Sequence, residues 1–162
     1  VTAIIGRREI MESAQSTFIS STFWTERIGS VAALKTLEVM ENERSWEKIS
    51  QIGNDVSKKW LALGKKHHLP LKVTGISAIP SFGFNSPNKL SYKTFITQEM
   101  LKKGYLATNL IFASTAHTKE IVDGYFENLE PIFKTIKECE EGLDISSLLD
   151  GPVCHSGFKR LN

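Results

Sequence analysis

One amphipathic stretch constrains the fold of this chain more than any other feature. Between residues 46 and 63, apolar side chains recur at intervals of three and four, at Trp46, Ile49, Ile52, Val56, Trp60 and Leu63. This spacing places them on one face of an α-helix. Because such a face must be buried against another layer, the rest of the chain has to supply a core around it. We expect Trp46 and Trp60, and the alternating Phe82 and Phe84, to pack in that core.

The residues after this helix predict a small sheet. His68-Leu69-Pro70 ends the helix, and residues 71–79 and 81–84 have the composition of two strands that break at Pro80. Residues 105–107 and 110–112 predict further strand. The second part of the chain is therefore expected to be α/β, with a three- or four-stranded, mainly antiparallel sheet and helices on one face.

Three more helices are expected in the chain. Residues 27–41 carry apolar side chains at a helical period, Ser91 favours a helix start and Gly104 a helix stop. Thr118 predicts the N-cap of a long helix that Pro131 should bend. The first forty residues fit the α/β unit poorly and are typical of the end of a different domain. We therefore expect two domains, residues 1–41 and residues 42–162.

Composition excludes several function classes. The 162 residues carry a net charge of +2, which is too small to favour nucleic acid as a partner. The sequence has no apolar stretch of the roughly 20 residues that a membrane-spanning helix needs. Two cysteines form no disulfide framework, so a cytoplasmic protein is expected. The chain begins without methionine and with a mostly apolar run from Val1 to Ile5, in which Ala3 to Ile5 predict a buried strand. We therefore expect it to be part of a longer protein.

Hydroxyl side chains gather just before the helix expected from residue 27. Ser20, Ser21 and Thr22 lie a few residues ahead of that helix start. Unpaired amides at a helix N-terminus favour an anion, and a hydroxyl can add a hydrogen bond to a phosphate. The same residues are also typical of an ordinary N-cap or turn. Both interpretations remain open on the residues alone.

The order of several segments resembles a known enzyme family. The segments are Ile4 to Met11, Ser21 to Trp24, Ala32 to Leu37, and Ser114 to Thr118. Together they resemble the class III pyridoxal-phosphate-dependent aminotransferases, especially the branch similar to glutamate-1-semialdehyde 2,1-aminomutase. The resemblance implies the C-terminal portion of a fold-type I pyridoxal-phosphate-dependent transferase. On that basis residues 1–41 are the trailing segment of the cofactor-binding large domain, and residues 42–162 are the small domain.

The resemblance also implies a cofactor contact. Family members are homodimers with the cofactor, pyridoxal 5'-phosphate, at the subunit boundary, and they move an amino group between small donor and acceptor substrates. The family's residue at the position of Thr22, with Ser21 beside it, binds the phosphate of the cofactor held by the partner subunit. In this chain Thr22 and Ser21 are therefore the candidate cofactor-binding residues.

Two family residues have no counterpart in this sequence. The lysine that forms the Schiff base lies in the family shortly before the segment matched by Ile5-Gly6-Arg7, and the first lysine here is Lys35. Lysine holds the cofactor and moves the substrate's proton, so no catalytic residue is expected in these 162 residues, and the chain alone should be inactive. Many members also bind a substrate carboxylate through an arginine in the region matched by residues 112–121, where this sequence has none. That absence fits the aminomutase-like branch.

Other groups of residues give weaker evidence for a functional site. His117, Cys139, Cys154 and His155 match no spacing of metal ligands, so no metal site is expected. His117 precedes a predicted helix cap. Its side chain could either make a structural hydrogen bond or lie in a substrate pocket, and both roles remain open. The alternative to an enzyme fragment is a non-catalytic α/β binding or interaction module.

Overall fold

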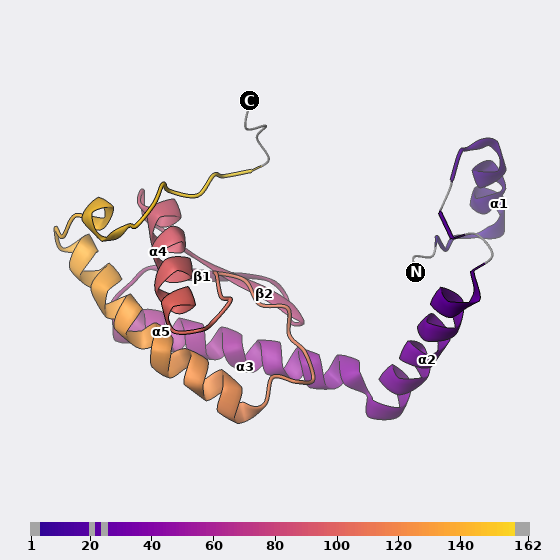
Figure 1. Ribbon diagram of the computed structural model, residues 1–162, viewed down its shortest axis with the longest axis horizontal. Helices are drawn as coiled ribbons and strands as arrows, with labels where there is room; N and C mark the ends of the chain where they lie inside the picture. Colours follow the sequence, from indigo (N-terminus) through magenta and orange to yellow (C-terminus); the bar gives the residue numbers. More distant parts are fainter. Residues whose placement is uncertain (1–3, 20–21, 24–25, 158–162) are drawn as a thin grey trace. The chain divides into compact units, whose positions relative to one another are not determined.

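The computed structural model describes residues 4–19, 22–23 and 26–157 (Figure 1). The chain divides into two compact units, Val1–Ser45 and Trp46–Asn162, called unit 1 and unit 2 below. Each unit is described by itself. None of the helices in the described residues is long and apolar enough to cross a membrane.

Unit 1 is helical, with little burial of its own. It contains the short helix α1 (Arg8–Met11), the 3-10 helix η1 (Glu12–Ser16) and the long helix α2 (Arg27–Glu43). The expected strand at residues 3–5 is absent from its described part, since Ile4 and Ile5 lie in no strand and are exposed, and Ala3 lies outside the described residues. The helix predicted over residues 27–41 is confirmed as α2, but none of its residues is buried.

Unit 2 contains the core. Its elements are α3 (Ser45–Lys66), β1 (Leu71–Ile76), β2 (Ile79–Phe84), α4 (Lys89–Lys102), α5 (Lys119–Glu140) and the 3-10 helix η2 (Ile145–Leu148). The helix predicted from residues 46–63 is confirmed as α3. The long helix predicted after Thr118 is confirmed as α5, which runs continuously through Pro131 and has the Thr118 hydroxyl as its cap. The helix expected from Ser91 begins slightly earlier, with Asn88 at its N-cap.

Aromatic side chains connect the helices to the sheet. The Phe82 ring centroid lies 4.7 Å from that of Trp60 on α3 and 5.9 Å from that of Phe133 on α5. Phe84 packs 5.4 Å from Phe133, so Trp60, Phe82 and Phe84 are core residues as predicted. Trp46 is 46% exposed, which contradicts its predicted core position. The reason is its place in the first turn of α3, since buried residues on that helix begin only at Gly53.

Helices α3 and α5 run side by side in the same direction (Figure 1). Two ion pairs connect the helices, Lys59 with Asp123 and, further along both helices, Lys66 with Glu130. Helix α3 also approaches the β1–β2 turn closely. A Cβ atom on Gly53 would lie 1.7 Å from the Ser77 carbonyl oxygen, so only glycine fits there.

The sheet differs from the prediction in where it breaks. Strands β1 and β2 form an antiparallel hairpin with Ile76 opposite Ile79, so the chain turns at Ser77 and Ala78 instead of at Pro80. Pro80 lies inside β2, opposite Gly75. Proline is tolerated there because its nitrogen faces away from β1, so the hairpin loses no hydrogen bond. The Phe82 amide faces the same side and donates to Asn109 O over 2.9 Å.

The same proline explains why the described sheet has two strands where three or four were predicted. Residues 109–113 do run along β2, since the Ile111 amide donates to Pro80 O over 3.2 Å and the Ala113 amide to Ala78 O over 2.9 Å. Pro80 has no N–H to return a bond to Ile111, so the ladder is interrupted. Only the isolated bridge between Ser81 and Leu110 forms, and residues 105–108 are irregular.

Candidate functional site

The predicted phosphate contact lies ahead of α2 in unit 1. Thr22 is exposed and sits in a bend of the chain, whereas Ser21 lies outside the described residues. Helix α2 has Glu26 as its N-cap, so Thr22 is not the cap of this helix, and the phosphate contact through Thr22 stays a prediction.

The N-terminus of α2 is capped by a carboxylate, not by a hydroxyl. The amides of Ile28 and Gly29 donate to the two oxygens of Glu26, over 2.8 and 3.0 Å, and the Glu26 amide donates to Phe23 O over 3.3 Å. A negative side chain at this position is favoured by the helix dipole. It also occupies amides that a phosphate would need and repels an anion. A phosphate near Thr22 therefore has to be bound without the first amides of α2.

Lys35 does not resemble a reactive lysine. It lies within α2, with its side chain 64% exposed, and its ammonium donates to Glu38 over 2.6 Å. That Lys35 is not the Schiff-base residue stays a prediction from the resemblance.

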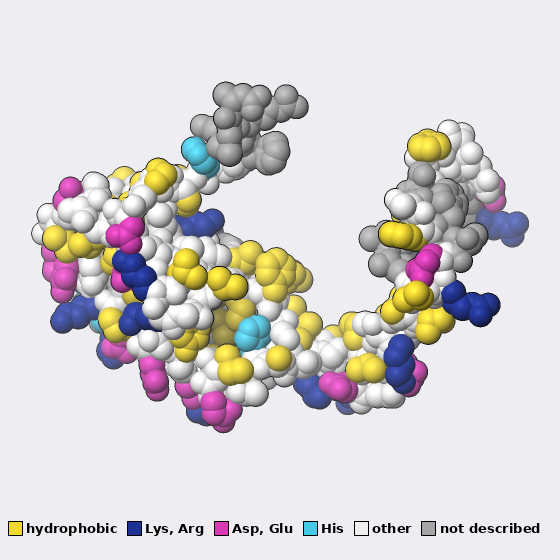
Figure 2. Space-filling model, viewed as in Figure 1, with side chains coloured by type: hydrophobic (Ala, Val, Ile, Leu, Met, Phe, Trp, Pro, Cys, Tyr) yellow, Lys and Arg dark blue, Asp and Glu magenta, His cyan; other side chains and the backbone are white. Residues whose placement is uncertain are grey.

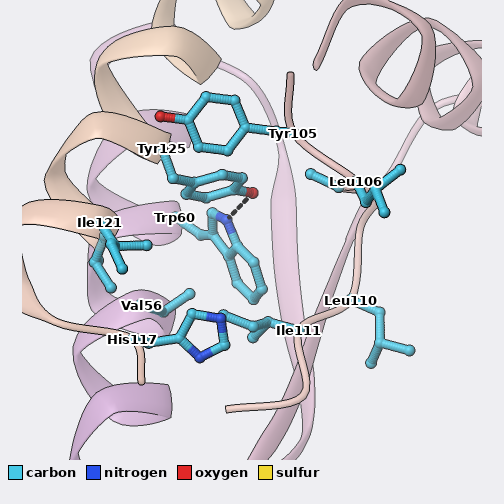
Figure 3. Close-up of a pocket in the computed structure, with 11 residues that line it drawn as sticks. Val56, Trp60, Tyr105, Leu106, Leu110, Ile111, His117, Ile121 and Tyr125 are labelled. Atoms are coloured by element: carbon cyan, nitrogen blue, oxygen red, sulfur yellow. Dashed lines mark hydrogen bonds between the residues drawn. The ribbon is translucent and has the colours of Figure 1, made fainter. Parts of the chain in front are cut away.

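Unit 2 holds a pocket that the sequence did not predict (Figure 3). It has a volume of about 130 Å³ and lies between α3, the irregular segment after α4 and the start of α5. The residues that line it are almost all apolar or aromatic: Val56, Trp60, Tyr105, Leu106, Ala107, Leu110, Ile111, His117, Ile121, Val122 and Tyr125. They come from three separate stretches of sequence, so no local sequence motif predicts the pocket.

A buried hydrogen bond forms one wall of this pocket. The indole Nε1 of Trp60 donates to the Tyr125 hydroxyl over 3.0 Å, as the dashed line in Figure 3 shows. Burial raises the pKa of Tyr125 far above its usual range, and the Trp60 bond lowers it by less. The phenol is therefore neutral at physiological pH, and this wall carries no charge.

His117 lies at one end of the pocket, in the loop before α5. The backbone amide of Ser114 donates to its Nδ1 over 2.9 Å, and the Ser114 hydroxyl accepts from the Ala116 amide over 3.2 Å. The imidazole thus makes the structural hydrogen bond that was one of the two predicted roles. It also lines the pocket, so the second role stays open.

A second, larger cavity adjoins the first. It has a volume of about 450 Å³, and His117 and Val122 line both cavities. Its other lining residues are Ile52, Asp55, Lys58, Lys59, Lys119 and Asp123. Lys119 and Lys59 both bind the Asp123 carboxylate, and these hydrogen bonds, Lys119 first, hold the pKa of Asp123 below its usual range.

In the described part of the chain, no group of three or more His, Cys, Asp or Glu residues could hold a metal ion. Cys139 is buried on α5, and Cys154 lies near α4, where its amide donates to the Thr94 hydroxyl over 2.9 Å. Both thiols are free.

Comparison with known proteins identifies the chain's relatives. No family model matches. The chain is 28% identical over 99 residues to the 3-aminobutyryl-CoA aminotransferase of Cloacimonas acidaminovorans, covering 60% of this chain and 24% of that protein. It is 23% identical to the aminopentol aminotransferase of Sphingopyxis macrogoltabida, covering 94% of this chain and 36% of that protein. A third relative is the 2'-deamino-2'-hydroxyneamine transaminase of Streptomyces kanamyceticus, 22% identical over 77% of this chain and 33% of that protein.

The chain is related to aminotransferases. The predicted resemblance to aminotransferases is confirmed, although the chain spans only 24–36% of the length of these relatives. The fold is confirmed as part of a pyridoxal-phosphate enzyme fold by the structure of the PLP internal aldimine form of the FumI protein from Sphingopyxis sp. MTA144. That structure matches with a TM-score of 0.71 at 22% identity, over 86% of this chain and 34% of the FumI chain.

Proposed function

We propose that the intact protein is a pyridoxal-phosphate-dependent aminotransferase of class III and that these 162 residues are its C-terminal portion. The observation that carries the proposal is that all three curated relatives are named aminotransferases or transaminases. The match to FumI, a pyridoxal-phosphate protein, supports it. A non-catalytic binding module is not favoured by any of these relatives.

In the proposed enzyme, unit 1 belongs to the large domain and unit 2 is the small domain. The predicted boundary, between residues 41 and 42, lies close to the division between Ser45 and Trp46. The exposure of α2 supports this assignment, since its side chains Ile28, Leu34 and Leu37 are 79%, 70% and 61% exposed. An apolar helix face of this kind is typical of a segment that the rest of its domain covers.

The chain's own contribution to the chemistry would be cofactor binding. The Thr22 hydroxyl, with Ser21 beside it, would donate a hydrogen bond to the phosphate of a cofactor held by the partner subunit of a homodimer. Glu26 would keep the start of α2 capped. The cofactor, when bound, supplies the electron sink that stabilises the substrate's carbanion. The lysine required for that reaction would come from another part of the protein.

We propose transamination of a small amino-group donor and acceptor as the reaction. The names of the relatives support amino transfer between substrates, whereas isomerisation in the manner of the aminomutase-like branch remains a prediction from the resemblance alone. The cytoplasm is the proposed compartment, which the free thiols of Cys139 and Cys154 support.

The test is to express the complete open reading frame and to add pyridoxal phosphate. The longer protein should turn yellow and transfer an amino group from an amine donor to a keto acceptor. The 162-residue chain should do neither, because it holds no Schiff-base lysine. A complete protein that binds no cofactor and stays colourless would overturn the proposal.

A further inference from the structure

The apolar pocket of unit 2 has the size of a small-ligand site. Its volume of about 130 Å³ is close to that of engineered apolar cavities, about 150 Å³, which bind benzene. Val56, Ile111 and Ile121 supply aliphatic walls, and the Trp60 ring supplies an aromatic one. An aliphatic chain of a few carbons would fill such a space and release its water.

One polar group enters this apolar space. Because the Ser114 amide donates to His117 Nδ1, that nitrogen carries the lone pair, and the ring hydrogen of the neutral imidazole is on Nε2. Figure 3 shows the opposite edge of the imidazole ring facing Trp60 and Ile111. Within residues 4–19, 22–23 and 26–157, no acceptor is hydrogen-bonded to Nε2. His117 therefore presents a fixed N–H donor to the pocket.

The adjoining cavity adds positive charge on the other side of His117. Three lysines and two aspartates line it, so its wall has an excess of one positive charge. Asp123 is shared by Lys59 and Lys119, which leaves N–H groups on both ammonium ions for another anion. The combined site is thus apolar at one end and cationic at the other.

We propose that these two cavities bind a short aliphatic monocarboxylate. Its hydrocarbon chain occupies the pocket between Trp60 and Ile111, and its carboxylate accepts a hydrogen bond from His117 Nε2 at the border with the lysine-lined cavity. The proposal goes beyond the proposed function. It involves residues of unit 2 alone and needs no cofactor, so it stands or fails independently of the aminotransferase assignment.

The test is a titration of the 162-residue chain with hexanoate, without pyridoxal phosphate, followed by NMR. The indole N–H of Trp60 reports on the pocket directly. We expect a saturable shift of this resonance, with hexanoate bound at least tenfold more tightly than either hexylamine or acetate. Hexylamine keeps the chain but reverses the charge, and acetate keeps the charge but lacks the chain. Equal binding of hexanoate and hexylamine would overturn the proposal.

Variants separate the two ends of the site. His117→Phe should weaken hexanoate binding about tenfold, the effect of losing one hydrogen bond to a charged group. His155→Phe is the matched control, since His155 is exposed and lines neither cavity. Unchanged hexanoate affinity in folded His117→Phe protein would contradict the proposed carboxylate contact.

Filling the pocket tests the apolar end. Ala107→Leu should abolish the hexanoate-induced shift of the Trp60 resonance. If this variant fails to fold, Leu110→Trp provides the same test, since Leu110 lines the pocket and is 37% exposed. Hexanoate binding that survives in a folded filled variant would place the ligand elsewhere and refute the proposal. A Trp60 shift that depends on protein concentration in the absence of hexanoate would instead show a second copy on the pocket, and would also refute it.

Discussion

At the scale of single residues, the proposed cofactor contact rests on Thr22. In the complete enzyme, Thr22→Ala should weaken pyridoxal-phosphate binding by about 1–2 kcal/mol, because one charge-assisted hydrogen bond is lost. Thr22→Ser should retain the wild-type dissociation constant, which is measured by titrating the apoenzyme. Thr17→Ala is the control, since the Thr17 hydroxyl is engaged with Ala14 O over 2.9 Å. A Thr22→Ala enzyme with wild-type affinity would remove Thr22 from the site.

The buried bond between Trp60 and Tyr125 makes a second residue-scale prediction. Tyr125→Phe leaves the Trp60 N–H without its acceptor, so the free energy of unfolding at pH 7 should fall by about 1–2 kcal/mol. Urea denaturation followed by circular dichroism measures this loss. An unfolding free energy equal to that of the wild type would mean that water replaces the phenol at no cost.

The same tyrosine predicts a loss of stability at alkaline pH. Because burial raises the pKa of Tyr125, the folded chain keeps the phenol proton above pH 10, whereas the unfolded chain releases it. The wild type should therefore lose stability above about pH 10, by up to about 1.4 kcal/mol per pH unit more than Tyr125→Phe. Below that pH the two proteins should differ by a constant amount. Parallel stability curves throughout the alkaline range would contradict this assignment.

At the same scale, the cap of α2 shows a limit of sequence reasoning. Ser and Thr are preferred N-caps and Glu is not, so the sequence favoured the hydroxyls ahead of Glu26. In the structure the longer Glu26 side chain folds back onto two amides. This cap depends on the extended backbone of Glu26, which the residue types do not determine.

At the scale of elements, the closest approach is that of α3 to the β1–β2 turn. Gly53→Ala would improve intrinsic helix propensity, yet it should destabilise the protein by about 2–3 kcal/mol, because its Cβ would overlap the Ser77 carbonyl. Gly83→Ala is the matched control, since a Cβ there meets no atom within 4 Å. Thermal unfolding of the two variants distinguishes them. Gly53→Ala protein as stable as Gly83→Ala would show that the turn moves freely.

Helices were predicted from the sequence better than the sheet was. Two local signals predicted helices that the structure confirms. They are the apolar period of three to four residues over residues 46–63, in α3, and the threonine before residues 119–140, in α5. A third strand was predicted from residues 105–107 and 110–112, but its interruption was missed because the cause is not local. The interruption occurs because the nitrogen of Pro80 faces residues 109–113 and has no hydrogen to donate to them. This orientation is known only from the pairing of β2 with residues 109–113.

At the scale of the whole molecule, stability is concentrated in unit 2. All the buried hydrophobic residues in the described part of the chain lie between Val56 and Ile145. A protein consisting of residues 45–162 should therefore keep the unfolding free energy of the 162-residue chain to within about 0.5 kcal/mol. Circular dichroism in urea checks this. A clearly lower midpoint for the shorter protein would mean that unit 1 contributes to the core.

The pocket belongs to this scale too, which explains why no motif predicted it. Its walls are brought together from residues 56–60, 105–111 and 117–125 only once α3 and α5 have aligned. His117 was singled out from the sequence as a candidate with two roles, but the direction of its free N–H depends on the turn formed by Ser114. Figure 2 shows apolar side chains at the surface of unit 2, on the face that is turned to the viewer.

The lack of any buried residue in α2 has a consequence for hydrogen exchange. A single helix of 17 residues without tertiary cover is only marginally stable in water, so its amides should exchange with deuterium much faster than those of α3. In a longer protein that covers Ile28, Leu34 and Leu37, the same amides should become protected. The exchange rate of α2 thus measures, amide by amide, how firmly the remainder of the enzyme holds the segment that follows Thr22.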